Sequence, residues 1–537
     1  MKKVTNIFLL IIFITTLKMY GQENSTPGKN LNLAVLQGDI ATVKKHIEAG
    51  SDLNRKDMYG STPLIVAATF GKTDIAKALI DAGADMNIGN NEKSTPLHIA
   101  SLLGYTNIVK ALLAKGAGKF LRNNNGSTAF DIVTAPFEYD KDIYDKLSKA
   151  LGPFGLNLDY NKIKSTRPKI AEMLRPTAEE LKTINYTPLM RDDWEVSTPA
   201  EQGLEPTLIA ELYLDASHLE TIYGLIVVKN GYLVAEKYFN KGSIDQLSRR
   251  ASVTKSYISA LIGIALNKGY LRGIDEKMID FFPDVSNKIT DKRKELITIR
   301  EMLQMRAGYP WEETDSTYWN AIWSGEYITK IADIPLTKDP GTEFQYSNLT
   351  SNWLGMILAR ACKTDLKTFG QENLFGPLNV KLGDWNRDLD GYYIGSGDIQ
   401  FTARDMAKFG LLYLNEGEYN GKKLIPSEWV RESLQRYSEN VNTAGIVSGR
   451  VGRYFKDIGY GFQWWSASVG NRQFSFAWGH GGQLIILLKD LNLVIVTTAD
   501  PFYGKEKHFE SWKYEKSIIN MAGKFIKYLP AKIKKNE

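Results

Sequence analysis

The chain has 537 residues, of which 43% are hydrophobic and 24% are charged, and these fractions are typical of soluble globular proteins. They argue against a largely disordered chain and against a protein with several membrane spans. Lysine and arginine number 67 against 61 acidic residues, so the net charge is only +6 and gives no sign of nucleic-acid binding.

The first 21 residues have the pattern of a secretory signal. Lys2 and Lys3 precede an apolar stretch from Ile7 to Leu17, and smaller and polar residues follow. The stretch is shorter than the roughly 20 residues that a spanning helix needs, so a membrane anchor is the weaker alternative. We expect a secreted or periplasmic protein without a membrane span once residues 1–21 are removed.

A repeat with a period of 33 residues follows. Residues 60–87 and 93–120 align at this shift, and the same interval separates three threonines and two sets of three glycines (Thr62, Thr95, Thr128; Gly38, Gly71, Gly104; Gly50, Gly83, Gly116). Each unit predicts a turn and two short helices, with the glycines in left-handed backbone at the helix ends.

The strings TPLIVAA and TPLHIA, together with this period, resemble the ankyrin repeat. The resemblance covers about residues 30–135 and implies an all-α solenoid whose concave face binds a protein partner. A spacer or a stabilising flank is the alternative. His98 falls where the repeat pattern has a histidine, so we expect a structural role for it rather than a ligand role.

Residues 136–190 are charged and interrupted by prolines, and we expect a linker with some helix. Beyond it, Asn230-Gly231 between two strand-like runs predicts a β-hairpin. Three more strand-like runs lie between Arg472 and Ala499, and residues 512–528 are typical of a closing helix. Strands at both ends with helices between them predict an α/β sandwich over residues 191–530.

Ser252 and Lys255 form the only Ser-x-x-Lys sequence in the chain. Ser252 could cap the helix that the apolar spacing of Ile258, Leu261 and Leu266 predicts, because serine is a preferred N-cap. Positions three apart share a helix face, however, so Lys255 can reach the hydroxyl and act as the base that a serine nucleophile needs.

A serine nucleophile also needs a second acid or base and donors for an oxyanion. Tyr346 and Asn348, in the polar loop GTEFQYSNLTSN, offer a phenol and an amide two residues apart; Tyr318, in another Tyr-x-Asn sequence, is the rival. His480, Gly481 and Gly482 end one predicted strand and begin the next, and they form the only His-x-Gly sequence of the chain.

These three motifs, in this order, resemble those of the serine β-lactamase and penicillin-binding-protein superfamily, in particular its class C, esterase and DD-peptidase branch. The resemblance covers roughly residues 190–530 and includes flanking strings such as LRGIDEKMIDFFPDV. It implies a multidomain chain in which the ankyrin solenoid precedes an α/β sandwich made of an antiparallel sheet, flanking helices and an all-helical subdomain.

The resemblance implies a role for each motif. Ser252 attacks the carbonyl and is acylated, with its own backbone N–H as half of an oxyanion hole. Lys255 and Tyr346 share the proton transfers as a coupled pair. Asn348 orients Lys255 and donates a hydrogen bond to the substrate.

In the third motif, Gln483 would supply the second oxyanion N–H, and Gly481 and Gly482 would let the substrate approach the strand. Many family members have Lys-Thr-Gly here, whereas His480 is mostly neutral near pH 7, so strong β-lactamase activity is not expected. A histidine at this place also occurs in DD-peptidases, in esterases and in hydrolases resembling 6-aminohexanoate-dimer hydrolase.

The sequence therefore predicts a serine hydrolase that cleaves a small-molecule or peptide ester or amide through an acyl-enzyme on Ser252. Cys362 is the only cysteine and the five histidines are scattered, so we expect no disulfide, no metal and no cofactor. One alternative is a DD-peptidase or D-aminopeptidase acting on cell-wall peptides. Another is a catalytically inactive binding protein based on the ankyrin repeats, although all four groups of the first two motifs are present.

Overall fold

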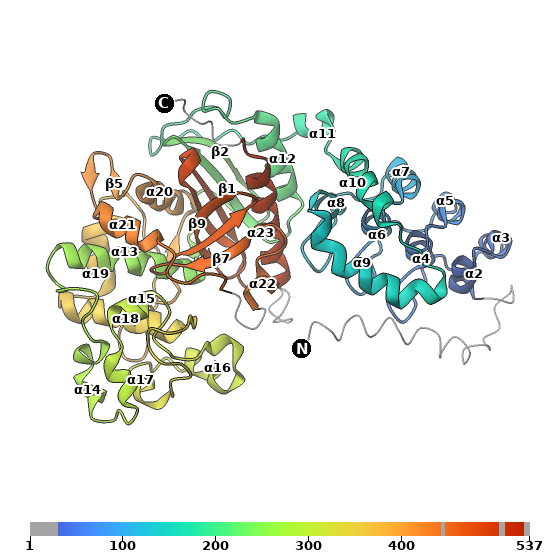
Figure 1. The fold of residues 1–537 in the computed structure, drawn as a ribbon. Helices are drawn as coiled ribbons and strands as arrows, with labels where there is room; N and C mark the ends of the chain where they lie inside the picture. Colours follow the sequence, from blue (N-terminus) through green and yellow to red (C-terminus); the bar gives the residue numbers. More distant parts are fainter. Residues whose placement is uncertain (1–29, 442–445, 504–510, 531–537) are drawn as a thin grey trace. The chain divides into compact units, whose positions relative to one another are not determined.

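The computed structural model describes residues 30–441, 446–503 and 511–530, which form two compact units that divide between Glu180 and Leu181 (Figure 1). The signal predicted over residues 1–21 lies outside the described residues. Among the helices of the described ranges, none is both long and apolar enough to cross a membrane.

The first unit is a stack of short helices that follows the 33-residue period. Thr62 and Thr128 cap α4 and α8 through their side chains, and Thr95 forms a capping box with His98 at the start of α6. All six repeated glycines have positive φ values, between 64° and 86°, as the repeat pattern predicts. The bounds are α2 (Leu31–Gln37), α3 (Ile40–Glu48), α4 (Pro63–Thr69), α5 (Thr73–Asp81), α6 (Pro96–Leu102), α7 (Thr106–Ala114) and α8 (Ala129–Thr134).

His98 joins one repeat to the next. Its side chain is buried, and its two ring nitrogens form hydrogen bonds with the Thr95 hydroxyl (2.8 Å) and with the carbonyl oxygen of Ser127 (3.0 Å). Burial lowers the pKa of His98 to about 4, so the ring stays neutral. The geometry agrees with the structural role expected for this histidine.

Most of the segment expected to be a linker is folded. α9 (Phe137–Leu151) and α10 (Tyr160–Leu174) belong to the first unit, and α11 (Ala178–Lys182) lies at its end. The buried Arg167 of α10 donates to the carbonyls of Val133 (3.2 Å) and Ala135 (3.1 Å) at the C-terminal end of α8, and it pairs with the buried Asp140 (2.9 Å). Because α9 and α10 carry charged residues on their outer faces, the sequence of this segment gives little indication of the packing.

The second unit is built on a seven-stranded antiparallel sheet in the order β2-β1-β11-β10-β9-β8-β7. The strands come from both ends of the unit, as predicted. Asn230 (φ 54°) and Gly231 (φ 89°) form the expected two-residue turn between β1 and β2. The bounds are β1 (Ile222–Lys229), β2 (Tyr232–Tyr238), β7 (Lys456–Tyr460), β8 (Trp465–Val469), β9 (Arg472–Gly479), β10 (Gln483–Leu488) and β11 (Leu493–Ala499).

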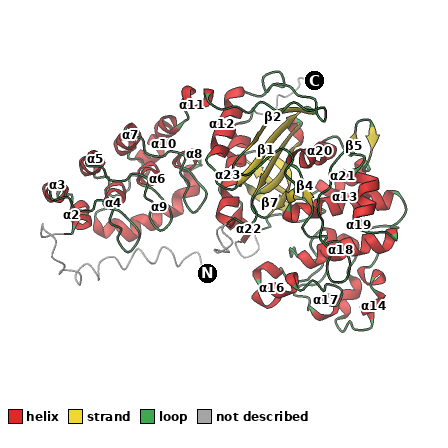
Figure 2. Cartoon of the chain, turned by 180° about the vertical axis from the view of Figure 1, so that it is seen from behind, coloured by secondary structure: helices red, strands yellow, loops and turns green. Residues whose placement is uncertain are grey.

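Helices cover both faces of this sheet (Figure 2). α12 (Pro206–Ser217) and α23 (Ser511–Tyr528) pack on one face, and α20 (Ala403–Leu414) packs on the other. Alternate residues of β1 therefore enter two cores, Leu225 on the α12 side and Ile226 on the α20 side. Because both faces are buried, β1 has a continuous apolar sequence.

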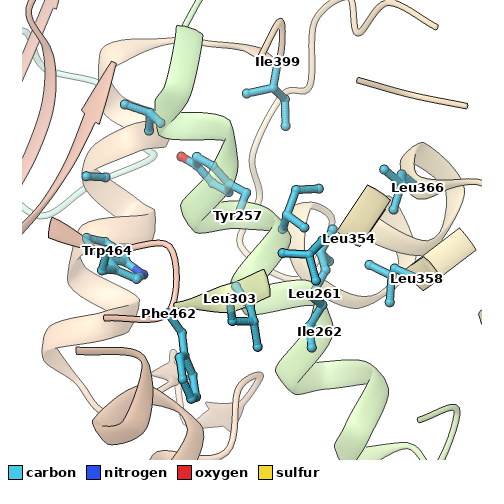
Figure 3. Close-up of a cluster of buried hydrophobic side chains, with 14 of the residues drawn as sticks. Tyr257, Leu261, Ile262, Leu303, Leu354, Leu358, Leu366, Ile399, Phe462 and Trp464 are labelled. Atoms are coloured by element: carbon cyan, nitrogen blue, oxygen red, sulfur yellow. The ribbon is translucent and has the colours of Figure 1, made fainter. Parts of the chain in front are cut away.

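Most of the remaining helices form a helical subdomain beside the sheet, as the resemblance implies. At its centre, Tyr257, Leu261 and Ile262 of α13 lie among Leu354 and other apolar side chains (Figure 3). This packing holds the N-terminal end of α13 in a fixed place. Its helices are α13 (Thr254–Asn267), α14 (Pro283–Ser286), α15 (Ile299–Leu303), α16 (Ser316–Trp323), α17 (Lys330–Asp333), α18 (Asn348–Cys362), α19 (Leu366–Gly370) and α21 (Ser427–Leu434). In contrast, α22 (Ile446–Arg450) packs against α23. The short strands are β3 (Ser248–Arg249), β4 (Gln400–Phe401), β5 (Glu418–Tyr419) and β6 (Lys422–Lys423).

Candidate active site

Ser252 lies in a short 3-10 turn, residues 251–253, that leads directly into α13. It is partly exposed, whereas the α13 residues that follow are buried. Neither the turn nor α13 has a side-chain cap, so Ser252 does not serve as an N-cap. Instead, its hydroxyl lies 2.9 Å from the Nζ atom of Lys255. The capping alternative is therefore wrong, and the hydroxyl is paired with an amine.

Lys255 is almost completely buried, and its Nζ atom has three partners. Besides the Ser252 hydroxyl, it contacts Asn348 Oδ1 (2.8 Å) and the carbonyl oxygen of Ser396 (2.8 Å). Burial lowers the pKa of Lys255 from 10.5 to about 7, against the opposing effect of Glu313 and Glu312. A substantial fraction of this amine is therefore neutral at neutral pH.

The neutral amine has two N–H donors and one lone pair. Asn348 Oδ1 and the Ser396 carbonyl are acceptors, so they take the two N–H groups. The lone pair then faces the Ser252 hydroxyl, which can donate its proton to it. This geometry suits proton removal from a serine nucleophile.

Tyr346 is buried next to this pair. Lys255 Nζ lies 4.9 Å from the centre of its ring, and the nearby Ser252 hydroxyl lowers the pKa of its phenol in opposition to burial. The ring is stacked on Trp465 (5.5 Å between centroids) and touches Trp311 (5.3 Å), and burial raises the pKa of the phenol. The rival Tyr318 instead lies on α16 and packs against the core of the helical subdomain.

Two carboxyl groups that sequence reasoning missed hold the second motif. Glu312 is buried and accepts hydrogen bonds from the Ser347 hydroxyl (2.6 Å) and from the backbone N–H of Asn348 (3.0 Å), where α18 begins. Burial raises the pKa of Glu312 to about 7. Glu313 accepts a hydrogen bond from Asn348 Nδ2 (3.0 Å). Together they fix the side chain that orients Lys255.

The third motif lies against the residues that precede Ser252. A Cβ atom on Gly479 would come within 2.3 Å of the Arg250 carbonyl oxygen and 3.3 Å of Ala251 Cβ, so the end of β9 touches the turn that carries Ser252. The Gln483 side chain is buried, where it accepts from Arg250 Nη1 (3.1 Å) and donates to the Ala499 carbonyl (2.7 Å). All three motifs therefore converge at the start of α13.

Gly481 and Gly482 are required by the turn itself. Their φ values are 81° and 94°, and a Cβ atom on Gly482 would lie 2.6 Å from Ile518 of α23. At Gly481, a Cβ atom would lie 2.7 Å from Pro501 Cα. Packing within the protein is therefore enough to explain both glycines, without the expected close approach of a substrate.

His480, the Gly481 backbone and two further residues form a charged cluster beside this turn. Gly481 N–H donates to Glu515 Oε2 (2.7 Å), and Arg450 pairs with Glu515 (3.0 Å) while its Nη2 atom lies 3.4 Å from His480 Nδ1. Burial lowers the pKa of His480. Arg450 and Glu515 come from α22 and α23, far from any motif, so no pattern in the sequence marked them. Within the described ranges, no three His, Cys, Asp or Glu side chains gather as metal ligands.

Two family models match this chain. Residues 223–518 match the model described as Beta-lactamase, which is more than half of the chain, and residues 31–123 match the model described as Ankyrin repeats (3 copies). These matches confirm both resemblances and the predicted fold class.

Curated relatives cover the second unit in part. A 6-aminohexanoate-dimer hydrolase from Paenarthrobacter ureafaciens is 25% identical over 289 residues, which are 50% of this chain and 71% of that protein. Beta-lactamase-like protein 2 from Dictyostelium discoideum is 24% identical over 243 residues, 40% of this chain but only 43% of its own length. A solved structure, an octameric penicillin-binding protein homologue from Pyrococcus abyssi, is 16% identical with a TM-score of 0.45, covering 60% of this chain and 76% of its own.

Proposed function

Because the chain belongs to the β-lactamase family, whose members are generally serine hydrolases, we propose that it cleaves an ester or amide bond through an acyl-enzyme on Ser252. The observation that carries the proposal is the amine of Lys255, which two carbonyl acceptors turn toward the Ser252 hydroxyl. The Paenarthrobacter relative, named as the hydrolase of an aminohexanoate dimer, supports the same class of reaction.

In the proposed reaction, Ser252 Oγ attacks the substrate carbonyl while its proton passes to the Lys255 and Tyr346 pair. The backbone N–H groups of Ser252 and Gln483 stabilise the oxyanion. The bond to the alcohol or amine then breaks, and the pair protonates the leaving group. In the deacylation step, water attacks the acyl ester and gives a proton to the same pair. The pair returns a proton to Ser252 Oγ as the acyl–oxygen bond breaks, and the carboxylic acid leaves.

Trapping the acyl-enzyme tests this proposal. Rapid acid quenching of the purified full-length chain with a p-nitrophenyl ester should give an intact mass increased by one acyl group, and peptide mapping should place that group on Ser252. Release of p-nitrophenol should begin with a burst equivalent to one site per chain if hydrolysis of the acyl ester is the slower step. Acylation at a different serine would contradict the assignment.

The pH dependence of the reaction should follow Lys255. Since only the neutral amine accepts a proton, kcat/KM should rise with pH along a limb centred near pH 7, where the pKa of Lys255 lies. Tyr346 is coupled to this amine, so the apparent pKa belongs to the pair. The measurement is kcat/KM for a neutral ester from pH 5 to pH 9.

Two controls accompany this profile. Because the pKa of Lys255 is lower in the folded than in the unfolded chain, its contribution to stability also rises with pH between about 7 and 10.5, so the melting temperature is measured at each pH. Glu312 titrates near pH 7 as well. In the Glu312→Gln variant the limb should persist; its disappearance would assign the limb to Glu312 instead.

We also propose that the chain is secreted or periplasmic and that the ankyrin repeats bind a protein partner. The pattern of residues 1–21 supports the first proposal. Ankyrin repeats generally present an extended surface for protein interaction, which supports the second.

A further inference from the structure

Arg450, the cation beside the third motif, is held by carboxylates. Its guanidinium pairs with Glu515 through Nε (3.0 Å) and Nη2 (3.2 Å), and its Nη1 atom lies 3.7 Å from Glu313. It also lies over the ring of Trp478, 5.0 Å from the centroid. Glu515 is completely buried, so this charge stays opposite Arg450 whatever occupies the site.

The second cation, Lys255, is equally engaged. Its Nζ atom is surrounded by Ser252, Asn348 Oδ1 and the Ser396 carbonyl, and only 2% of the residue is exposed. A substrate anion therefore has no route to this amine except through the nucleophile. The charge of Arg450 is matched by two carboxylates, and Lys255, whose partners are neutral, is buried and partly uncharged at neutral pH, so neither group offers an accessible, unmatched positive charge to a substrate anion.

Of the groups beside the third motif that are charged at neutral pH, the one most exposed to solvent is an acid; the His480 side chain is more exposed (32%), but burial lowers its pKa, so it is mostly neutral. The Glu313 side chain is 25% exposed, against 13% for Arg450 and none for Glu515. Glu313 also holds Asn348, which contacts Lys255, so its carboxylate lies within the same network as the nucleophile. An incoming carboxylate would meet this negative charge, and like charges in contact oppose binding strongly.

We infer that the site selects acyl substrates that carry no carboxylate beside the scissile bond, and that Glu313 is the residue that excludes them. The inference rests on the proposed function, since it deepens the substrate class of the same site. A lysine in place of His480 would present a fixed cation to such a carboxylate, whereas His480 lies beside the paired Arg450 and Glu515.

Arylboronic acids provide a test that does not require turnover, because they bond reversibly to a nucleophilic serine. Phenylboronic acid and 3-carboxyphenylboronic acid differ by one carboxylate. The full-length protein should bind the neutral compound at least about tenfold more tightly, as measured by calorimetry, because Glu313 opposes the carboxylate.

The Glu313→Gln variant keeps an acceptor for Asn348 Nδ2 and removes the charge, so the ratio of the two dissociation constants should fall several-fold. Glu428→Gln, at an exposed position of α21, makes the same charge change elsewhere in the second unit and should leave the ratio unchanged. If the wild-type protein binds both compounds equally, or if the ratio is unchanged in Glu313→Gln, the inference is overturned and the proposed function still stands. If Ser252→Ala binds both compounds as the wild type does, the nucleophile assignment fails, and the inference fails with it.

Discussion

Replacing Ser252 by alanine is expected to lower kcat/KM for a p-nitrophenyl ester by about 1,000-fold or more, because the covalent route through the acyl-enzyme is lost. The fold should survive, since Ser252 is partly exposed and caps no helix. Loss of one hydrogen bond at such a position costs about 1 kcal/mol or less. Steady-state kinetics and thermal melting of the two proteins together measure both quantities.

Ser256 offers a matched control on the same helix. Its buried hydroxyl donates to the carbonyl oxygen of Gln463 at 2.8 Å. Ser256→Ala should therefore reduce the free energy of unfolding by about 1 kcal/mol while most of the turnover remains. If Ser252→Ala retained its turnover, a different serine would be the nucleophile, and the proposed function would need another site.

Replacing Lys255 by methionine should lower kcat by about 100-fold to 10,000-fold, which is the usual contribution of a positioned acid or base. Methionine fills a similar volume without an amine, so Ser252 loses the group that receives its proton. The rate of p-nitrophenol release in a single turnover is the direct measurement, because it reports acylation alone.

Stability and acylation should respond in different ways to this substitution. Lys255→Met leaves two buried acceptors unpaired, but it also removes the desolvation cost of the buried amine. The free energy of unfolding should therefore fall by at most about 1 or 2 kcal/mol relative to the wild type. Lys255→Arg is the second variant, since a guanidinium is too weak an acid to serve as a base at neutral pH. Acylation within tenfold of the wild type in either variant would assign proton removal to Tyr346 without Lys255.

Local patterns predicted much of the fold. The 33-residue period and the left-handed glycines are properties of short segments, and the structure has them where the sequence predicts; it also shows that the repeated threonines Thr62 and Thr128 cap helices. The Asn230-Gly231 hairpin is equally local. The segment 136–190 was the exception, because α9 and α10 are charged on their outer faces and show their apolar contacts only when packed on the repeats.

The candidate site divides in the same way. Ser252 and Lys255 are three residues apart on one helical turn, so the sequence by itself determined that their side chains could meet. The hairpin turn and the positive φ values of Gly481 and Gly482 are likewise local, whereas the close packing of these two glycines on Pro501 and Ile518 is tertiary.

Only the tertiary structure decided how these groups are charged. The amine of Lys255 has a low pKa because the core buries it, and the carboxylates Glu312, Glu313 and Glu515 reach the motifs from segments 34 residues or more away. A side chain's pKa and its ion pairs depend on neighbours in space. Local sequence patterns contain no information about those neighbours, so the pairing of Ser252 with Lys255 was predictable, whereas the residues that determine the charge of this pair were not.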